Sequence, residues 1–251
     1  MFGQRAKIGR YLQFIGDSKH VQNVKGPMHR EMVHFQDHFI GDTLSADNWL
    51  ATVTNATIAV NHAYPGGWAL ITTSAGQDNE SCFLATPLAW EDDMKAICEA
   101  RILSTDVSGV ALYFGFSDAT LEGTPDMPID YADGTLAAAA DNAVGFICDF
   151  DDSVNGINSI VAVGVNGTTL ETAIDSAVDW EDGAIHILRV ELNPDGDAVF
   201  FLDGKRIGFM PTALTSGTML CIITGVANRD AGADTVYIDR VDGWQDEYIV
   251  L

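Results

Sequence analysis

The chain has 251 residues, of which 47% are hydrophobic and 20% charged, and its formal net charge is −23. A chain of this size can bury a sizeable core, and its aromatic residues are spread throughout, which argues against wholesale disorder. Because so acidic a protein repels a phosphate backbone and an anionic membrane, we expect neither nucleic acid nor a membrane among its partners.

The charge is divided unevenly along the chain. Residues 1–31 carry a net charge of +4, whereas residues 32–251 carry −27. A basic leader with no room for a core of its own, followed by an acidic body, predicts two units with different roles. We therefore expect an anchoring arm over residues 1–31 and a folded domain over residues 32–251.

The leader contains one short helical pattern, in which Ile8, Leu12 and Ile15 are spaced by four and three residues. The rest is polar and irregular, so we expect an arm that is partly extended and partly short-helical. The start of the chain lacks the continuous apolar segment of a secretory signal, which predicts a protein made and used without export by a signal peptide. The arm residues expected to bind a partner are Phe2, Arg5, Lys7, Ile8, Arg10, Leu12, Phe14 and Ile15.

From residue 32 onward the dominant period of the sequence is two. Apolar residues alternate over 110–116, 144–150 and 185–192, and turn sequences such as Asn155-Gly156 and Asp203-Gly204 separate such segments. Many short strands and no long amphipathic helix predict an antiparallel β-sandwich or jelly roll. The residues expected to point into its core are Phe114, Phe146, Leu188 and Phe201.

Two further features concern the body. Residues 120–142 are the least regular segment, and the run from Leu136 to Ala140 leads us to expect a long loop off the sandwich with one helical turn. The cysteines are far apart in apolar stretches with no C-x-x-C pair, which predicts buried free thiols in preference to disulfides or a metal site. They are Cys82, Cys98, Cys148 and Cys221.

A family resemblance rests on the last third of the chain. There a strand over 185–192, a turn over 193–196 and a strand ending in F-x-x-D-G-K at Lys205 resemble the concanavalin A-like lectin/glucanase jelly roll. Other segments look like tailed-phage virion proteins built on that jelly roll, and the resemblance covers residues 33–247. Those segments are 34–39, 47–49, 99–101, 115–118 and 143–146.

The resemblance also directs attention to carboxylates. Glycosidases of this class resemble one another in an E-x-D-x-x-E strand, whose alternation places the carboxylates in one groove. The nearest match begins at Glu91, and its third acidic position falls on Ala96. We interpret Glu99 and Glu191 as charges on solvated strand faces. The sequence therefore predicts no catalytic residues and a protein that is not an enzyme.

The richest cluster of side-chain oxygens consists of Asp149, Asp151, Asp152 and Asn155. It begins like a calcium loop, but the twelfth position, where a bidentate Glu should close the site, is Ala162, which excludes an EF-hand. A looser calcium site remains a weak alternative to a solvated acidic turn. We expect no metal and no other cofactor.

Together these observations predict a non-enzymatic virion structural protein of a tailed phage. We expect a capsid decoration or cement protein whose arm binds the major capsid protein or another virion protein. The resemblance implies a homo-oligomer, with a trimer as the specific expectation, on the capsid surface after synthesis in the host cytoplasm. The alternative is a lectin-like carbohydrate-binding module of a fibre or tail protein, and a glycan-cleaving enzyme comes third.

Overall fold

The computed structural model describes residues 32–62, 66–74, 80–120, 126–132, 134–230 and 232–246. The predicted arm, with its short helix and its eight partner-binding residues from Phe2 to Ile15, lies outside the described residues. Among the described residues, no helix is both long enough and apolar enough to cross a membrane.

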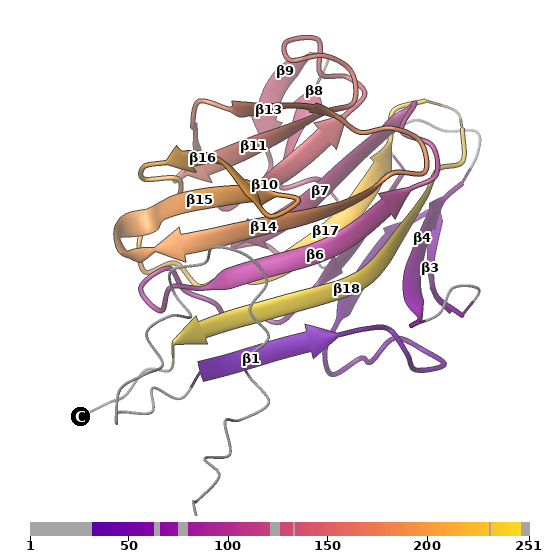
Figure 1. The fold of residues 1–251 in the computed structure, drawn as a ribbon, viewed down its shortest axis with the longest axis horizontal. Coiled ribbons are helices and arrows are strands. Elements are labelled where there is room, and N and C mark those ends of the chain that lie inside the picture. The colour runs from indigo at the N-terminus through magenta and orange to yellow at the C-terminus, as the bar shows by residue number, and fades with distance from the viewer. Residues whose placement is uncertain are drawn as a thin grey trace, which may run out of the picture.

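The body is a sandwich of two eight-stranded antiparallel sheets (Figure 1). We call them sheet A and sheet B. Sheet A has the order β16-β15-β14-β6-β18-β4-β3, with β1 also paired to β18. Its strands are β1 (Met32–Asp37), β3 (Ala56–Asn61), β4 (Trp68–Thr73), β6 (Ile97–Ser104), β14 (Ile185–Asn193), β15 (Asp197–Leu202), β16 (Lys205–Met210) and β18 (Thr235–Asp246).

Sheet B has the order β12-β11-β10-β7-β17-β5-β2, with β13 also paired to β11. The predicted all-β antiparallel sandwich is thus confirmed, and a short 3-10 turn at Pro194–Gly196 is the helical element among the described residues. The strands of sheet B are β2 (Leu50–Thr54), β5 (Ser81–Ala85), β7 (Val110–Ser117), β10 (Asn142–Asp149), β11 (Ser159–Asn166), β12 (Thr169–Leu170), β13 (Ile174–Asp179) and β17 (Cys221–Asn228).

The core lies between the two sheets and follows the period of two in the sequence. Phe114, Phe146 and Leu188 are fully buried in it, as predicted. The prediction for Phe201 is wrong, because β15 turns Phe200 inward and leaves Phe201 on the outer face, with the Arg189 guanidinium 5.6 Å from its ring. Two adjacent phenylalanines fit either register, and a slip of one residue exchanges the faces of a strand.

The long loop predicted over residues 120–142 contains a β-hairpin where a helical turn was expected. β8 (Ile129–Ala132) pairs with β9 (Thr135–Ala138), so that Ile129 lies opposite Ala138. Alanine is the strongest helix former, but helix propensity is small beside tertiary contacts, and burial of the apolar side chains of β8 against sheet B outweighs it. The hairpin lies beside sheet B at one end of the sandwich (Figure 1).

All four cysteines are buried and free, as predicted. Burial raises the pKa of Cys82 to about 12 and that of Cys221 to about 12. Thiols that remain protonated at neutral pH are poor nucleophiles and poor metal ligands. These residues therefore act as small apolar side chains of the core.

Candidate functional site

The outer face of sheet B is paved with apolar side chains and glycines. Tyr113 on β7 lies against Gly145 on β10, where an added Cβ would come within 2.9 Å of the tyrosine Cζ. Phe83 on β5 lies against Gly225 on β17 in the same way, with its Cδ1 2.1 Å from the position of an added Cβ. The glycines thus let two aromatic rings rest directly on the backbone of the sheet.

The hairpin β8–β9 closes this face. Met127, Ile129 and Tyr131 are buried in one cluster with Tyr113 and other residues of the outer face of sheet B, which we call the floor. The side chains that cover the floor are therefore as enclosed as those that form it. In the described part of the chain, the central outer face of sheet B is an additional core and not a surface open to a ligand.

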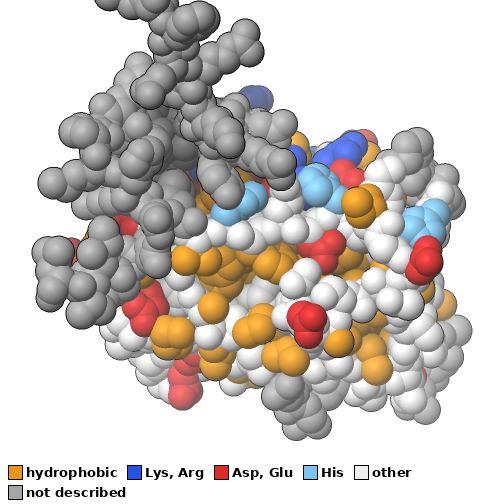
Figure 2. Space-filling model, turned by 90° about the horizontal axis from the view of Figure 1, so that it is seen from below, with side chains coloured by type: hydrophobic (Ala, Val, Ile, Leu, Met, Phe, Trp, Pro, Cys, Tyr) orange, Lys and Arg blue, Asp and Glu red, His pale blue; other side chains and the backbone are white. Residues whose placement is uncertain are grey.

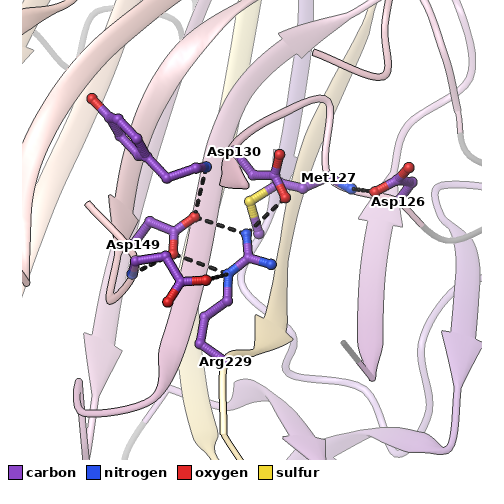
Figure 3. A network of polar contacts seen from close by, with 7 residues as sticks. Asp126, Met127, Asp130, Asp149 and Arg229 are labelled. Carbon is purple, nitrogen blue, oxygen red and sulfur yellow. Dashed lines mark hydrogen bonds and ion pairs between the residues drawn. The ribbon is translucent and has the colours of Figure 1, made fainter. Parts of the chain in front are cut away.

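A buried ion-pair hub at Arg229 joins the hairpin to sheet B (Figure 3). Arg229 follows β17, and its Nη2 lies 2.7 Å from Asp130 Oδ2 on the hairpin and 2.8 Å from Asp149 Oδ2 on β10. Its Nε donates a hydrogen bond to Asp149 Oδ1 at 3.0 Å. The backbone N–H of Tyr131 also donates to Asp149 Oδ2, at 3.0 Å. One guanidinium and one carboxylate thus hold three segments together.

The charges of the hub are shaped by its burial. Burial raises the pKa of Asp130. The negative charges of Asp149 and Asp126 raise this pKa further, whereas Arg229 lowers it. Burial also disfavours the charged guanidinium of Arg229, but hydrogen bonds and charges from Asp149 and Asp130 outweigh it and place the pKa above its ordinary value. Arg229 therefore stays charged.

The four calcium candidates lie around this hub. Asp152 is fully buried and accepts hydrogen bonds from the backbone N–H groups of Val154 and Asn155, at 2.9 Å each. Asn155 Nδ2 donates to Asp152 Oδ2 at 2.9 Å, and Asp151 Oδ2 lies 3.7 Å from Arg229 Nε. The solvated acidic turn is a wrong description, because Asp149 and Asp152 are buried.

A guanidinium supplies the positive charge beside these oxygens. The described residues include no group of three or more His, Cys, Asp or Glu side chains that could hold a metal ion. Arg229 was not linked to the cluster from the sequence because 80 residues separate it from Asp149. Its place directly after β17 gave no signal of the pairing.

A second array of charges crosses the outer face of sheet A. Glu99 on β6 lies opposite Asp242 on β18 and opposite Arg189 on β14. Arg240 joins the two acids, with Nη2 2.5 Å from Glu99 Oε1 and Nε 2.5 Å from Asp242 Oδ2. We call these residues, with Glu191, the ionic ladder; Glu191 pairs with Arg189 at 2.5 Å.

The ladder corrects the interpretation of Glu99 and Glu191 as solvated charges. Glu99 is 4% exposed, Glu191 3% and Asp242 2%. Burial raises the pKa of Glu99, with Asp242 adding to the effect and Arg189 and Arg240 opposing it. Burial likewise raises the pKa of Asp242. Alternation along one strand placed Glu99 on an outer face but could not reveal which charges neighbouring strands bring beside it.

The residues nearest to a glycosidase motif have structural roles. Asp92 is fully buried and accepts hydrogen bonds from Gly196 N at 2.9 Å and Gly217 N at 2.8 Å, which fixes two loops. Ala96 lies in the core. No tryptophan or tyrosine is exposed among the described residues; Trp244 and Tyr237 are partly buried, and Phe209 on β16 is the exposed aromatic of that part of the chain.

Comparisons with known proteins support the fold. No family model matches the chain, and no curated protein matches it. A lichenase (beta-1,3-1,4-glucanase) derived from a mouse hindgut metagenome is similar with a TM-score of 0.58 and 11% identity, over 85% of this chain and 99% of that one. A laminarinase from Flavobacterium sp. UMI-01 has a TM-score of 0.57 and 13% identity, over 84% and 99% of the two chains.

The carbohydrate recognition domain of Emp47p is also similar, with a TM-score of 0.58 and 13% identity, over 88% of this chain and all of that domain. At such low identity the likeness shows the fold alone. Two antiparallel sheets in this arrangement match a concanavalin A-like jelly roll, which confirms the structural part of the resemblance seen in the sequence.

The same comparisons overturn the expectation that the chain is not an enzyme. That expectation rested on one acidic position that falls on Ala96, yet the lichenase and the laminarinase have this fold at 11% and 13% identity. At this distance a single sequence motif is a poor guide, because carboxylates on different strands can form a pair. Glu99 and Asp242 are such a pair.

Proposed function

We propose that this chain is a surface protein of a tailed-phage virion, a decoration protein that residues 1–31 attach to the major capsid protein. One observation carries the proposal, namely the way cations are distributed between the leader and the body. The jelly roll then faces solvent, and its charge keeps particles apart. A closed homo-oligomer, with a trimer as the specific form, belongs to this proposal, as does synthesis in the host cytoplasm.

Most basic side chains of the body form ion pairs with acidic side chains of the body itself. Arg101, Arg189, Arg229 and Arg240 pair with acids at 2.5–2.8 Å, and Lys95 lies 3.8 Å from Asp246. In the view from below, acidic groups stand singly among hydrophobic and neutral ones, and Lys and Arg side chains show along one border (Figure 2).

Two exposed cations remain in the body. Lys205 and Arg206 form no ion pair among the described residues and occupy the start of β16. Attraction to an acidic partner surface therefore depends on the six basic residues of the leader. The closed outer face of sheet B fits this role, because a body sealed by its own hairpin needs no ligand to complete its core.

The test is co-sedimentation with undecorated heads of the phage that encodes the chain. The full-length triple variant Arg5→Glu, Lys7→Glu, Arg10→Glu should no longer sediment with heads, with the largest difference from wild type at low salt, where charges are least screened. The double variant Lys205→Glu, Arg206→Glu is the matched control and should sediment as wild type does. Equal sedimentation of wild type and the triple variant would refute attachment by the leader.

A second candidate function is glycan cleavage, and the pairing of Glu99 with Asp242 favours it. Hydrolysis of a glycosidic bond uses two carboxyl groups in different protonation states, and these two face each other across neighbouring strands with raised pKa values. Mixed-linkage β-glucan and laminarin are the substrates to test, by release of reducing sugar. Turnover that falls at least about 100-fold in Glu99→Gln and in Asp242→Asn would support this function.

The control for this assay is Asp195→Asn, an exposed acid in the Pro194–Gly196 turn. Wild-type turnover that survives both substitutions would exclude the Glu99–Asp242 pair. Retention of the protein on a glucan matrix without turnover would instead favour the lectin-like alternative.

A further inference from the structure

One end of the core is closed by polar side chains. Ile71, Ile102 and Val226 point into the core. Thr73, Ser104 and Asn228 lie two positions further along the same strands and therefore on the same side. Glu80, just before β5, and Asp234, just before β18, join them, and all of these residues are almost fully buried. We call this set the polar plug: Thr73, Glu80, Ser104, Asn228 and Asp234.

Hydrogen bonds across the sandwich show that the plug is one assembly. Asn228 Nδ2, at the end of β17 in sheet B, donates to the carbonyl oxygen of Ser74, next to β4 of sheet A, at 2.9 Å. The backbone N–H of Ser74 donates to Glu80 Oε2 at 3.1 Å. Asp234 N donates to Thr73 Oγ1 at 2.9 Å. The ends of both sheets therefore meet at these residues.

The side-chain hydrogen-bond donors of Asn228 and Ser104 in the plug bind backbone carbonyl oxygens. Asn228 Nδ2 binds the carbonyl oxygens of Ser74 and Gly232, and the Ser104 hydroxyl donates to the carbonyl oxygen of Asp106 at 2.7 Å. Asp234 Oδ2 and Asn228 Oδ1 are enclosed, and neither accepts a hydrogen bond from the described residues. Buried polar atoms are nearly always satisfied, so two enclosed acceptor oxygens point to a missing partner, either a hydrogen-bond donor or a cation.

The charge of the plug leads to the same conclusion. Asn228 is 0% exposed and Asp234 3%, and Glu80 is buried as well. No Lys, Arg or His among the described residues forms an ion pair with Glu80 or Asp234. Asp230 and Asp106 lie close enough to add to the negative potential at Asp234. Two buried carboxylates without a counter-charge are costly to the fold.

We propose that the polar plug binds a hard divalent cation, Ca²⁺, through Asp234 Oδ2 and Asn228 Oδ1 with the carboxylate of Glu80 as a further ligand. One divalent ion balances the two carboxylates, and oxygen is the donor atom that Ca²⁺ prefers. The ligand set mixes carboxylate and amide oxygens, so it differs from the groups of three or more His, Cys, Asp or Glu side chains that the described residues lack. Asn228 immediately precedes Arg229, but the proposed ligands differ from Asp130 and Asp149, the carboxylates that Arg229 binds.

The experiment follows the thermal unfolding of the full-length protein after EDTA treatment and dialysis, with and without added CaCl₂. A cation that binds only the folded state should raise the midpoint of unfolding by roughly 5 °C or more at a hundredfold excess over its Kd. Isothermal titration calorimetry should give one bound Ca²⁺ per chain. Mg²⁺ should raise the midpoint less, because its octahedral geometry is more demanding.

Four variants locate the ion. Asp234→Asn and Asn228→Leu should each lose most of the response to Ca²⁺, whereas Glu181→Gln, an exposed acid elsewhere, should keep it. Asp151→Asn tests the cluster around Arg229 and should also respond as wild type does. If Asn228→Leu fails to fold, the calorimetric titration of Asp234→Asn decides. A wild type that does not respond to Ca²⁺, or a response that only Asp151→Asn removes, would overturn the proposal.

Discussion

Asp130 on the covering hairpin and Asp149 at the end of β10 share one nitrogen, Arg229 Nη2, at 2.7 Å and 2.8 Å. This shared nitrogen is one polar link between the hairpin and the sheet that it covers, beside the hydrogen bond from the Tyr131 N–H to Asp149. The apolar contacts of Ile129 and Tyr131 with the floor of sheet B lie beside it. Hairpin and hub are therefore expected to be lost together.

Substitution of Arg229 by Leu should test this coupling. It leaves two carboxylates buried without a cation, which costs about 3–5 kcal/mol in the free energy of unfolding. Urea unfolding measures the change, and the dye ANS should report exposed apolar floor residues. Arg206→Leu removes an exposed arginine of β16 and should change stability by less than about 0.5 kcal/mol. A similar loss in both variants would contradict a structural role for the hub.

The glycines under the aromatic rings of sheet B should not tolerate a methyl group. In Gly225→Ala the new Cβ would lie 2.1 Å from Phe83 Cδ1 and 2.4 Å from the carbonyl oxygen of Cys82. Because the backbone of a central strand cannot move away, we expect a loss of about 1–3 kcal/mol or more in the free energy of unfolding. Gly41→Ala, at an exposed position, is the matched control and should be nearly neutral.

The register of β15 gives a paired prediction. Phe200→Ala removes a ring that meets Phe146 edge-on in the core, with ring centroids 5.6 Å apart, and should cost about 3–5 kcal/mol. Phe201→Ala removes the ring beside Arg189 on the outer face and should cost about 1 kcal/mol. Chemical denaturation of both variants decides: a larger loss in Phe201→Ala than in Phe200→Ala would mean that β15 has the other register, and equal losses would contradict the assignment of the two faces.

Much of the fold could be predicted from the sequence because the alternation of apolar residues within a single strand shows which of its side chains face the core. Alternation in β7 correctly separated Phe114, which faces the core, from Tyr113, which faces outward. The same reasoning failed at Phe200 and Phe201, where both neighbours are apolar. It also failed for β9, because the alanines there become extended only by pairing with β8.

The charged sites could not be predicted, since each joins segments that are distant in sequence. Asp149 was singled out as part of an oxygen cluster, but its partner Arg229 lies 80 residues further along the chain. Glu99 was assigned to an outer face, but Arg240 and Asp242, which bury it, belong to the last strand. Asp234 showed no pattern at all, because its burial depends on loops between the two sheets.

The ionic ladder should make stability depend on pH. Burial raises the pKa of Glu99 and of Asp242 in the folded state. Carboxyl groups with raised pKa values contribute stability that is fully present below their unfolded values, about 4, and that is lost as the pH rises through the folded values. The contribution of both groups to the free energy of unfolding should therefore fall from about pH 4 upward.

Glu99→Gln and Asp242→Asn isolate this effect, since neither replacement can ionise. The free energy of unfolding of each variant minus that of wild type should increase as the pH rises from about 4 to neutrality. This holds whatever the substitution costs at low pH. Urea unfolding at several pH values gives this difference, with Asp195→Asn as an exposed control that should show a smaller change. If the difference stays constant, or moves in favour of wild type, burial does not dominate at these carboxylates and the pairing with Arg240 and Arg189 is the stronger influence.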